Sequence, residues 1–197
     1  MHPAVFGPFA TNCYFIWEDP ADALLIDAGF APGAIEKKAK QLSLRVAAIL
    51  ITHGHGDHIV GAKALRLAFD CPLYYPEGDL FLATGEFYGE AYEVPRPTHL
   101  LHGGEHLTLG GMEIGVLSVP GHSPGHIAYR IGDDLFSGDC LFHDSIGRFD
   151  LEGSDEAQLY VSLQRLLALG DGVRVYPGHG PATTIGAERR ENPFLQA

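Results

Sequence analysis

The sequence predicts an α/β protein in which strands and helices pack as layers. Two observations carry this prediction. Apolar, strand-like runs alternate with an amphipathic helix between residues 46 and 75. Each half of the chain also contains strands, a helix, and histidines or aspartates that come directly after a strand. With 197 residues the chain can bury one sizeable core, so a single domain over residues 1–197 is expected.

Strands and helices can be assigned in order along the first half of the chain. Apolar runs bounded by turn-forming residues predict strands at residues 12–17, 23–27, 46–51 and 71–75. Apolar residues at helical spacing predict one helix after Pro32 and another over residues 59–69. Asp27 ends the second strand, where it could either support the neighbouring loop or form a turn.

The second half of the chain predicts two hairpins, a helix and a final strand. The hairpins cover residues 107–119 and 127–137, each around a glycine-containing turn. Ser154 is the predicted N-cap of the helix, because acidic residues follow it in the first turn and leucines then recur at helical spacing. Residues 173–176 are the predicted last strand.

Residues 76–105 are the least regular part of the sequence. Aromatic side chains are spread there among glycines, prolines and acidic residues. Long irregular segments in compact proteins often form lids or binding loops, which is one interpretation of this segment. The alternative is that the aromatic residues only anchor the segment to the core.

A stretch rich in metal-ligand residue types follows the strand at 46–51. It reads Thr52-His53-Gly54-His55-Gly56-Asp57-His58. Unpaired imidazoles and a carboxylate this close to a buried strand would be costly without a shared cation, so the stretch predicts a metal-binding loop. His53 and His55 can face one metal, while Asp57 and His58 can serve a second. The two glycines are expected to let the loop turn tightly.

Three further loops present the same residue types after a predicted strand. They carry His122, Asp139 and His179. A lone histidine beside glycine or proline is usually a turn residue, but four strand ends that all carry such residues indicate one shared metal centre. His126 is expected beside that centre, or at the start of a strand, and not as a ligand.

Composition limits the classes of partner. The net charge of −12 makes nucleic acid an unsuitable general partner, because phosphate binding needs a basic surface. No signal peptide is visible at Met1, and no apolar run reaches membrane-spanning length. The three cysteines are odd in number and scattered, which favours a reducing compartment, so a cytoplasmic protein without a membrane partner is expected.

The order of these motifs resembles the metallo-β-lactamase-fold superfamily. His-x-His-x-Asp-His is followed by Gly-His, Gly-Asp and Gly-His, and the resemblance covers essentially the whole chain. It implies an αβ/βα four-layer sandwich of two mixed β-sheets with helices outside, and metals at one edge of the sheets.

The resemblance also implies a ligand set for two divalent metal ions. His53, His55 and His122 would hold the first ion, and Asp57, His58 and His179 the second, with Asp139 bridging both. These nitrogen and oxygen donors suit zinc, which is expected, and are compatible with iron or manganese. Two cations roughly 3.5–4 Å apart can generate a bridging hydroxide near neutral pH. Asp57 would also be catalytic, by orienting the nucleophile and moving a proton.

Finer similarity points to glyoxalase II-like hydrolases, that is, hydroxyacylglutathione hydrolases. It lies in residues 138–142, 146–150 and 178–194. The implied substrate is a small thioester or ester such as S-D-lactoylglutathione, contacted by Phe142, Arg148 and Arg189. An arginine suits a carboxylate, although either arginine could instead form a surface ion pair. The chain departs from the family in lacking a C-terminal helical region and the usual tyrosine near Arg148.

Other functions stay open at this stage. A related persulfide dioxygenase would use one iron held by His53, His122 and Asp139. Lactone or generic ester hydrolysis is an alternative within the same fold. A non-catalytic metal-binding protein should lack a ligand, whereas all seven are present. Neither the acyl group nor the oligomeric state, monomer or small homo-oligomer, follows from the sequence.

Overall fold

Two six-stranded β-sheets form the centre of the computed structural model, which describes residues 2–6 and 9–196. The first sheet contains, in spatial order, β1 (His2–Phe6), β2 (Thr11–Ile16), β3 (Ala23–Ile26), β4 (Val46–Leu50), β5 (Leu73–Pro76) and β8 (His99–Leu101). The second contains β16 (Thr183–Thr184), β15 (Arg174–Pro177), β12 (Asp134–Gly138), β11 (Ile127–Ile131), β10 (Met112–Ser118) and β9 (His106–Leu109). Each sheet combines parallel and antiparallel pairs.

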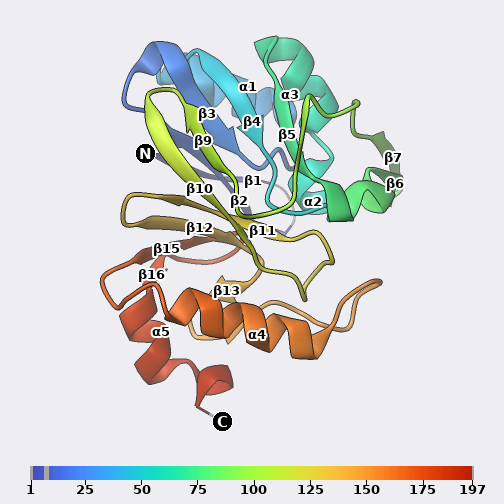
Figure 1. Cartoon of the computed structure of the whole chain (residues 1–197). Helices are drawn as coiled ribbons and strands as arrows, with labels where there is room; N and C mark the ends of the chain where they lie inside the picture. Colours follow the sequence, from blue (N-terminus) through green and yellow to red (C-terminus); the bar gives the residue numbers. More distant parts are fainter. Residues whose placement is uncertain (1, 7–8, 197) are drawn as a thin grey trace.

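Helices cover the outer face of each sheet (Figure 1). On the first sheet these are α1 (Pro32–Gln41) and α3 (Ala62–Phe69), with the short α2 (Gly56–Ile59) before α3. On the second they are α4 (Glu156–Leu167) and α5 (Ile185–Glu191). The predicted four-layer αβ/βα sandwich is therefore confirmed. No helix among the described residues is both long and apolar enough to cross a membrane.

The alternation of side chains along the strands explains the layers. Along β2, Tyr14 and Ile16 pack between the two sheets, whereas Cys13 and Phe15 pack against the helices. Successive strand residues point to opposite faces, so a strand that is buried on both faces must be apolar throughout. This is why residues 13–16 of β2, together with β3 and β4, form continuous apolar runs and do not alternate with polar residues.

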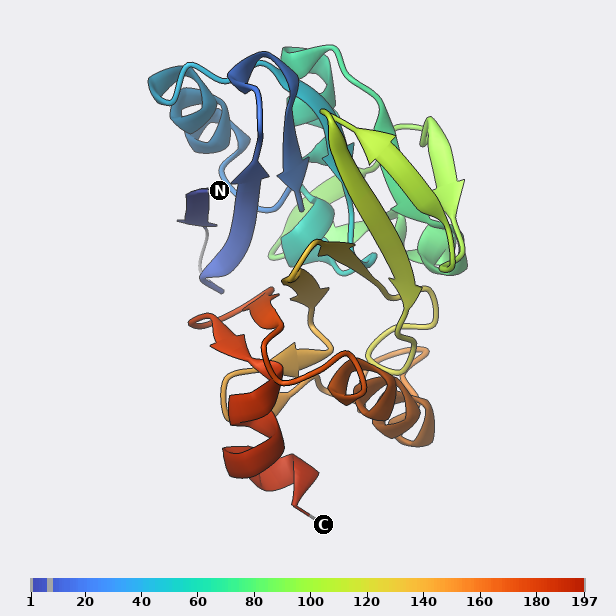
Figure 2. The same cartoon turned by 60° about the vertical axis from the view of Figure 1, so that its left-hand side comes forward.

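The first strand was not predicted from the sequence. β1 pairs antiparallel with β2, and its residues fit no strong strand pattern. Figure 2 shows these N-terminal strands in blue and the C-terminal segment in red on the same side of the molecule. The two are joined directly, because Thr11 forms a β-bridge with His179. The N-terminus of the chain therefore supports a loop that is more than 160 residues away in sequence.

The helix predicted over residues 59–69 is divided, which corrects that prediction. α2 ends at Ile59 and α3 begins at Ala62. The Gly61 amide donates to the Ala28 carbonyl at 2.8 Å instead of continuing the first helix. A Cβ at Gly61 would lie 2.3 Å from the Gly29 carbonyl oxygen, so only glycine permits this close crossing.

Two other local predictions need correction. Asp155, not Ser154, is the N-cap of α4, since its side chain accepts from the Gln158 amide at 2.9 Å. Residues 76–105 also contain more regular structure than expected. They include the 3₁₀ helix Glu77–Leu82, the hairpin of β6 (Thr84–Phe87) and β7 (Glu90–Glu93), and strand β8.

Candidate metal centre

The four predicted loops meet at one edge of the two sheets. The loop from Thr52 to His58 follows β4, and the loops carrying His122, Asp139 and His179 follow β10, β12 and β15. The seven side chains come together in three overlapping groups, within each of which the candidate ligand atoms lie within 4.8 Å of one another. The groups are His53/His55/His122, His53/His58/Asp139 and Asp57/His58/His179.

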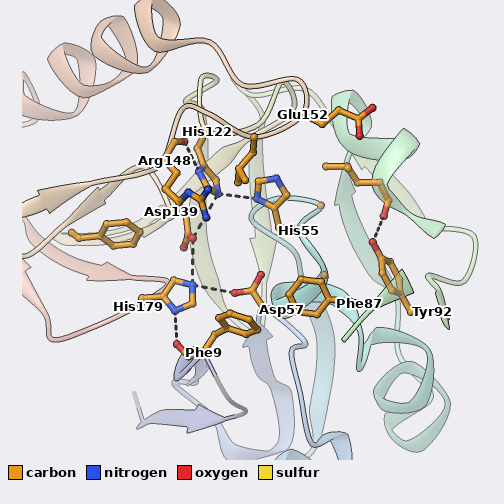
Figure 3. Close-up of a pocket in the computed structure, with 15 residues that line it drawn as sticks. Phe9, His55, Asp57, Phe87, Tyr92, His122, Asp139, Arg148, Glu152 and His179 are labelled. Carbon is orange, nitrogen blue, oxygen red and sulfur yellow. Dashed lines mark hydrogen bonds and ion pairs between the residues drawn. The ribbon is translucent and has the colours of Figure 1, made fainter. Parts of the chain in front are cut away.

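The first group brings ring nitrogens from both halves of the chain together. His55 Nδ1 lies 2.8 Å from His122 Nε2, and the His53 ring lies 4.9 Å from both of the other rings. His53 and His122 are buried, and His55 faces the pocket (Figure 3).

Asp139 lies between this first group and the group formed by Asp57, His58 and His179. Its Oδ2 is 3.6 Å from His122 Nε2 and 3.3 Å from His179 Nε2, while its Oδ1 is 3.3 Å from His58 Nε2. Asp57 Oδ2 lies 3.1 Å from His179 Nε2. One carboxylate is thus adjacent to both groups, as the bridging role proposed for Asp139 requires.

The imidazoles are oriented by hydrogen bonds on their outer nitrogens. His58 Nδ1 lies 2.8 Å from Asp27, whose carboxylate also accepts from the Thr52 amide at 2.8 Å. His122 Nδ1 donates to the Arg148 carbonyl at 2.8 Å, and His179 Nδ1 donates to the Phe9 carbonyl at 3.0 Å. Such contacts leave the other ring nitrogen free to face a metal. Asp27 therefore supports the loop, which was one of its two expected roles.

Two buried atoms in the cluster show that its donor set fits a metal. His53 Nε2 has no hydrogen-bond partner among the described residues, and Asp139 Oδ1 makes no hydrogen bond there although His58 Nε2 lies 3.3 Å away. Buried polar atoms without hydrogen bonds are costly. The backbone also comes unusually close to the cluster at Gly178. A Cβ there would lie 2.1 Å from Asp139 Oδ1 and 2.7 Å from the His58 ring. Imidazole and carboxylate donors that converge on a shared space are the coordination chemistry of a divalent cation.

The pKa values in the first group favour neutral imidazoles. Burial and the neighbouring His122 lower the pKa of His55 to about 4. Burial and the adjacent His58 also hold the pKa of His53 well below its usual value. Neutral imidazole is the form that binds metals, so both rings are in the coordinating state at neutral pH.

The carboxylate of Asp139 is held in its charged form, in contrast to the neutral imidazoles of the first group. Burial would raise the pKa of Asp139, but His58 and His179 hold it well below its usual range. Burial alone would lower the pKa of His179, but its hydrogen bonds to Asp139 and Asp57 outweigh burial and raise this pKa to about 10. Ionised carboxylates around the second group therefore favour positive charge at that place, whether a proton or a metal ion supplies it.

The glycines of the metal loop have a different purpose from the one predicted. Neither Gly54 nor Gly56 has a positive φ angle, so a tight left-handed turn does not explain them. A Cβ at Gly54 would lie 2.9 Å from the Asp79 and Leu82 side chains, and a Cβ at Gly56 would lie 2.6 Å from the Phe87 ring. The glycines instead allow residues 77–87 to pack directly on the loop.

Asp79 joins the first metal loop to the loop that carries His122. Its fully buried carboxylate accepts from the Gly54 amide at 2.8 Å, the Ser123 hydroxyl at 2.6 Å and the Gly125 amide at 2.6 Å. Burial raises the pKa of Asp79, and these three hydrogen bonds oppose the rise. This clamp was not predicted, since a lone aspartate in an irregular segment gives no sequence signal.

A cavity of about 670 Å³ opens beside the cluster. His55, Asp57, His122, Asp139 and His179 lie on one side of it (Figure 3). The rest of the lining is mostly apolar and comes from separate segments: Phe9, Leu82, Phe87, Tyr92, Phe142 and Leu151. Residues 82–92 therefore border the site, as the lid interpretation requires, and Tyr92 and Ala83 also pack on the core, as the anchoring interpretation requires.

The predicted substrate contacts are placed unequally. Phe142 and Arg148 line the cavity, although Arg148 forms a bidentate ion pair with Asp150 at 2.9 and 3.0 Å. Arg189 does not line it, and instead bonds to the Leu167 carbonyl and to Asp171. The structure therefore does not support Arg189 as a substrate contact. His126 is fully buried, and its Nε2 accepts from the Asp139 amide at 3.3 Å.

Several supporting residues carry no recognisable signal in the local sequence. Thr11 donates to Asp57 at 3.2 Å, and Asn12 donates to the carbonyls of Pro177 and Gly180 at 2.9 Å each. The Ser154 hydroxyl, which does not cap α4, donates to the His122 carbonyl at 2.8 Å. These contacts join segments far apart in sequence, so no local pattern could reveal them.

Comparison with known proteins identifies the family of this chain and agrees with the fold. A family model described as the metallo-beta-lactamase superfamily matches residues 6–179, and the chain belongs to that superfamily. Hydroxyacylglutathione hydrolase GloC of Haemophilus influenzae is 35% identical, over 96% of this chain and 94% of that protein. The probable metallo-hydrolase YqgX of Bacillus subtilis is 36% identical over the same shares of the two chains. The chain is thus a metallo-hydrolase of this superfamily.

Solved structures are similar over almost the entire chain. The BLEG-1 B3 metallo-beta-lactamase has a TM-score of 0.94 at 36% identity and covers 100% of this chain and 99% of its own. TTHA1623, crystallised in a di-iron-bound form, has a TM-score of 0.91 at 41% identity, with coverages of 99% and 100%. ETHE1 from Myxococcus xanthus has a TM-score of 0.82 at 29% identity, with coverages of 98% and 83%.

Proposed function

We propose that this protein is a binuclear metal-dependent hydrolase that cleaves a small thioester or ester. The observation that carries the proposal is the convergence of seven ligand-type side chains, two of them with buried atoms that make no hydrogen bond, on one side of a substrate-sized cavity. The similarity to a hydroxyacylglutathione hydrolase makes S-D-lactoylglutathione the first substrate to test.

The proposed first ion is held by His53, His55 and His122, and the second by Asp57, His58 and His179, with Asp139 shared. Divalent ions bound there would supply Lewis acidity and lower the pKa of water. All donors are nitrogen or oxygen, so zinc remains the expected metal and manganese is compatible. Iron is a serious alternative because the similar TTHA1623 was crystallised with two irons.

The chain's own residues would orient the reaction. Asp57 faces the cavity and is held by the Thr11 hydroxyl and His179. Burial would raise the pKa of Asp57, but His58 and His179 lower it, so its carboxylate is ionised and can accept a proton from an attacking water. The apolar walls of the cavity would exclude bulk water from the reacting carbonyl.

A second candidate is a mononuclear iron persulfide dioxygenase. His53, His122 and Asp139 could form its three-residue site, and the likeness to ETHE1 is compatible with it. The presence of Asp57, His58 and His179 as a further group favours the binuclear hydrolase.

Metal analysis and substrate assays on the purified protein test the proposal. We expect two metal ions per chain and hydrolysis of S-D-lactoylglutathione or of a simpler thioester. His53→Ala should lose metal and activity together, whereas His106→Ala, on an exposed strand position, should retain both. One iron per chain, no thioester cleavage, and oxygen uptake with glutathione persulfide would reject the hydrolase in favour of the dioxygenase.

A further inference from the structure

We infer that the cavity binds an apolar, uncharged group several carbons long next to the metal centre, and that it is not built for a carrier with several charged groups such as glutathione. The inference deepens the proposed function and rests on it for the reaction. It is supported by the composition of the wall, the state of its polar groups, and the packing behind it.

The wall is apolar and begins directly beside the cluster. The Phe142 ring lies 6.1 Å from the His179 ring, so apolar surface lies directly beside the candidate ligands. Phe9, Leu82, Phe87 and Leu151 extend the apolar lining of the same cavity. Burying apolar surface is worth about 0.8 kcal/mol for each methylene, so such a wall can discriminate by chain length.

Polar groups of the wall are already engaged or carry the wrong charge. The Tyr92 hydroxyl donates to the Leu82 carbonyl at 3.1 Å, and the Arg148 carbonyl accepts from His122. Among the described lining residues that are not candidate ligands, Arg148 is the one cation, and Asp150 already neutralises it. Glu152 adds a negative charge to the rim (Figure 3). Glutathione carries two carboxylates and one ammonium, so this rim offers it no unpaired cation.

The aromatic wall is packed from behind. The Phe87 ring lies 5.4 Å from the Phe9 ring and 5.5 Å from the Phe30 ring, and it rests against Gly56 of the metal loop. Phe9 is also fixed through its carbonyl, which holds His179. A wall supported in this way is largely formed before a ligand arrives, which reduces the entropy lost on binding.

Calorimetric binding of thioethers, which cannot be hydrolysed, tests the inference on the metal-loaded protein without relying on turnover. We expect S-hexyl-N-acetylcysteamine to bind about 1000-fold more tightly than its S-methyl analogue, which has five fewer methylenes. S-hexylglutathione should bind no more tightly than the neutral S-hexyl compound. Equal affinities for the methyl and hexyl compounds, or tighter binding of the glutathione compound by tenfold or more, would overturn the inference.

Variants locate the binding to this wall. Phe142→Ala should reduce the hexyl-to-methyl affinity ratio about tenfold and leave the metal content unchanged. Phe194→Ala, a matched change at an aromatic residue that does not line the cavity, should leave the ratio unaltered. An unchanged ratio in Phe142→Ala would place the binding elsewhere and reject the assignment.

Kinetics separate failure of this inference from failure of the proposed function. If the inference holds, kcat/KM for N-acetylcysteamine thioesters should rise about fourfold for each added methylene from acetyl to hexanoyl. Hydrolysis of glutathione thioesters in preference, without dependence on chain length, would keep the hydrolase and reject the apolar subsite. Binding that follows chain length without hydrolysis of any thioester or ester would keep the apolar subsite and reject the hydrolase.

Discussion

The two halves of the chain contribute to the metal centre in different ways. The N-terminal half supplies His53, His55, Asp57 and His58 from a single loop after β4. The C-terminal half supplies one residue from each of three loops: His122, Asp139 and His179. Ligand residues in a single loop can be recognised from the local sequence. Ligand residues in three separate loops can be recognised as one site only when the sheets bring them together.

The halves also differ in what holds their ligands. The His58 side chain is fully buried and is oriented by Asp27, which belongs to the same half. The His179 side chain is 27% exposed and is oriented by the Phe9 carbonyl from the other end of the chain. His58 is therefore oriented within its own half, while His179 depends on a contact between the halves.

Substituting one histidine from each half gives the largest expected effects. His58→Ala leaves Asp27, Asp57 and Asp139 without their central partner, so we expect kcat/KM to fall about 1000-fold or more and one metal to be lost. His179→Ala removes a partly exposed ring that water can replace, so the loss should be about tenfold smaller. Metal content and thioester hydrolysis of both variants measure the difference.

Equal losses of kcat/KM in the two histidine variants, or a larger loss in His179→Ala, would contradict the proposed difference between the two halves. His106→Ala is the control, since this histidine lies at an exposed strand position outside the cluster.

Removing the clamp between the halves should have an intermediate effect. Asp79→Ala leaves the Gly54 amide, the Ser123 hydroxyl and the Gly125 amide without their acceptor. We expect metal affinity to fall about 10- to 100-fold and the free energy of unfolding to fall by about 3 kcal/mol. Chelator competition and denaturant unfolding of the metal-free protein measure these two quantities separately.

Ser123→Ala is the graded control for the clamp, because it removes only one of the three hydrogen bonds. Its metal affinity should fall by threefold or less. If Asp79→Ala lowers stability but leaves metal affinity unchanged, Asp79 supports the fold alone and does not position the two histidine loops.

The same contrast explains how much could be predicted from the sequence. The buried strand at Val46–Leu50 and its histidine loop are local, so both the strand and the gathering of their side chains were predicted correctly. The layers followed from apolar strand runs and helical spacing. The family resemblance placed His122, Asp139 and His179 in the same site, and the structure brings them there.

What the sequence could not reveal depends on contacts between distant segments. Gly54 and Gly56 were assigned to a tight turn. In the structure they instead leave space for Asp79, Leu82 and Phe87 to pack on the loop. Arg189 looked like a carboxylate ligand by its position in a motif, yet it bonds to the end of α4. In each case the residue type suited two roles, and only the tertiary partner distinguishes them.

Thiol labelling compares the stability of the two halves with the smallest perturbation. Cys13 lies in the core beneath the first sheet, Cys140 lies in the core beneath the second, and both are fully buried. Because His179 depends on a contact between the halves, metal removal should open the C-terminal half first. We expect alkylation of Cys140 at pH 8 to become about tenfold faster than that of Cys13, measured by peptide mass spectrometry.

The pH of this experiment follows from the thiol pKa values. Burial raises the pKa of Cys13 from its ordinary value of 9.0 to about 12, so the folded thiol stays protonated and unreactive at pH 8. Above pH 9 the unfolded thiol ionises first, so the folded state loses stability as pH rises toward 12, by up to about 1.4 kcal/mol per pH unit. At pH 8 this loss is absent, and labelling reports opening alone. Faster labelling of Cys13 than of Cys140 there would show that the N-terminal half depends more on the metals, and would reverse the comparison.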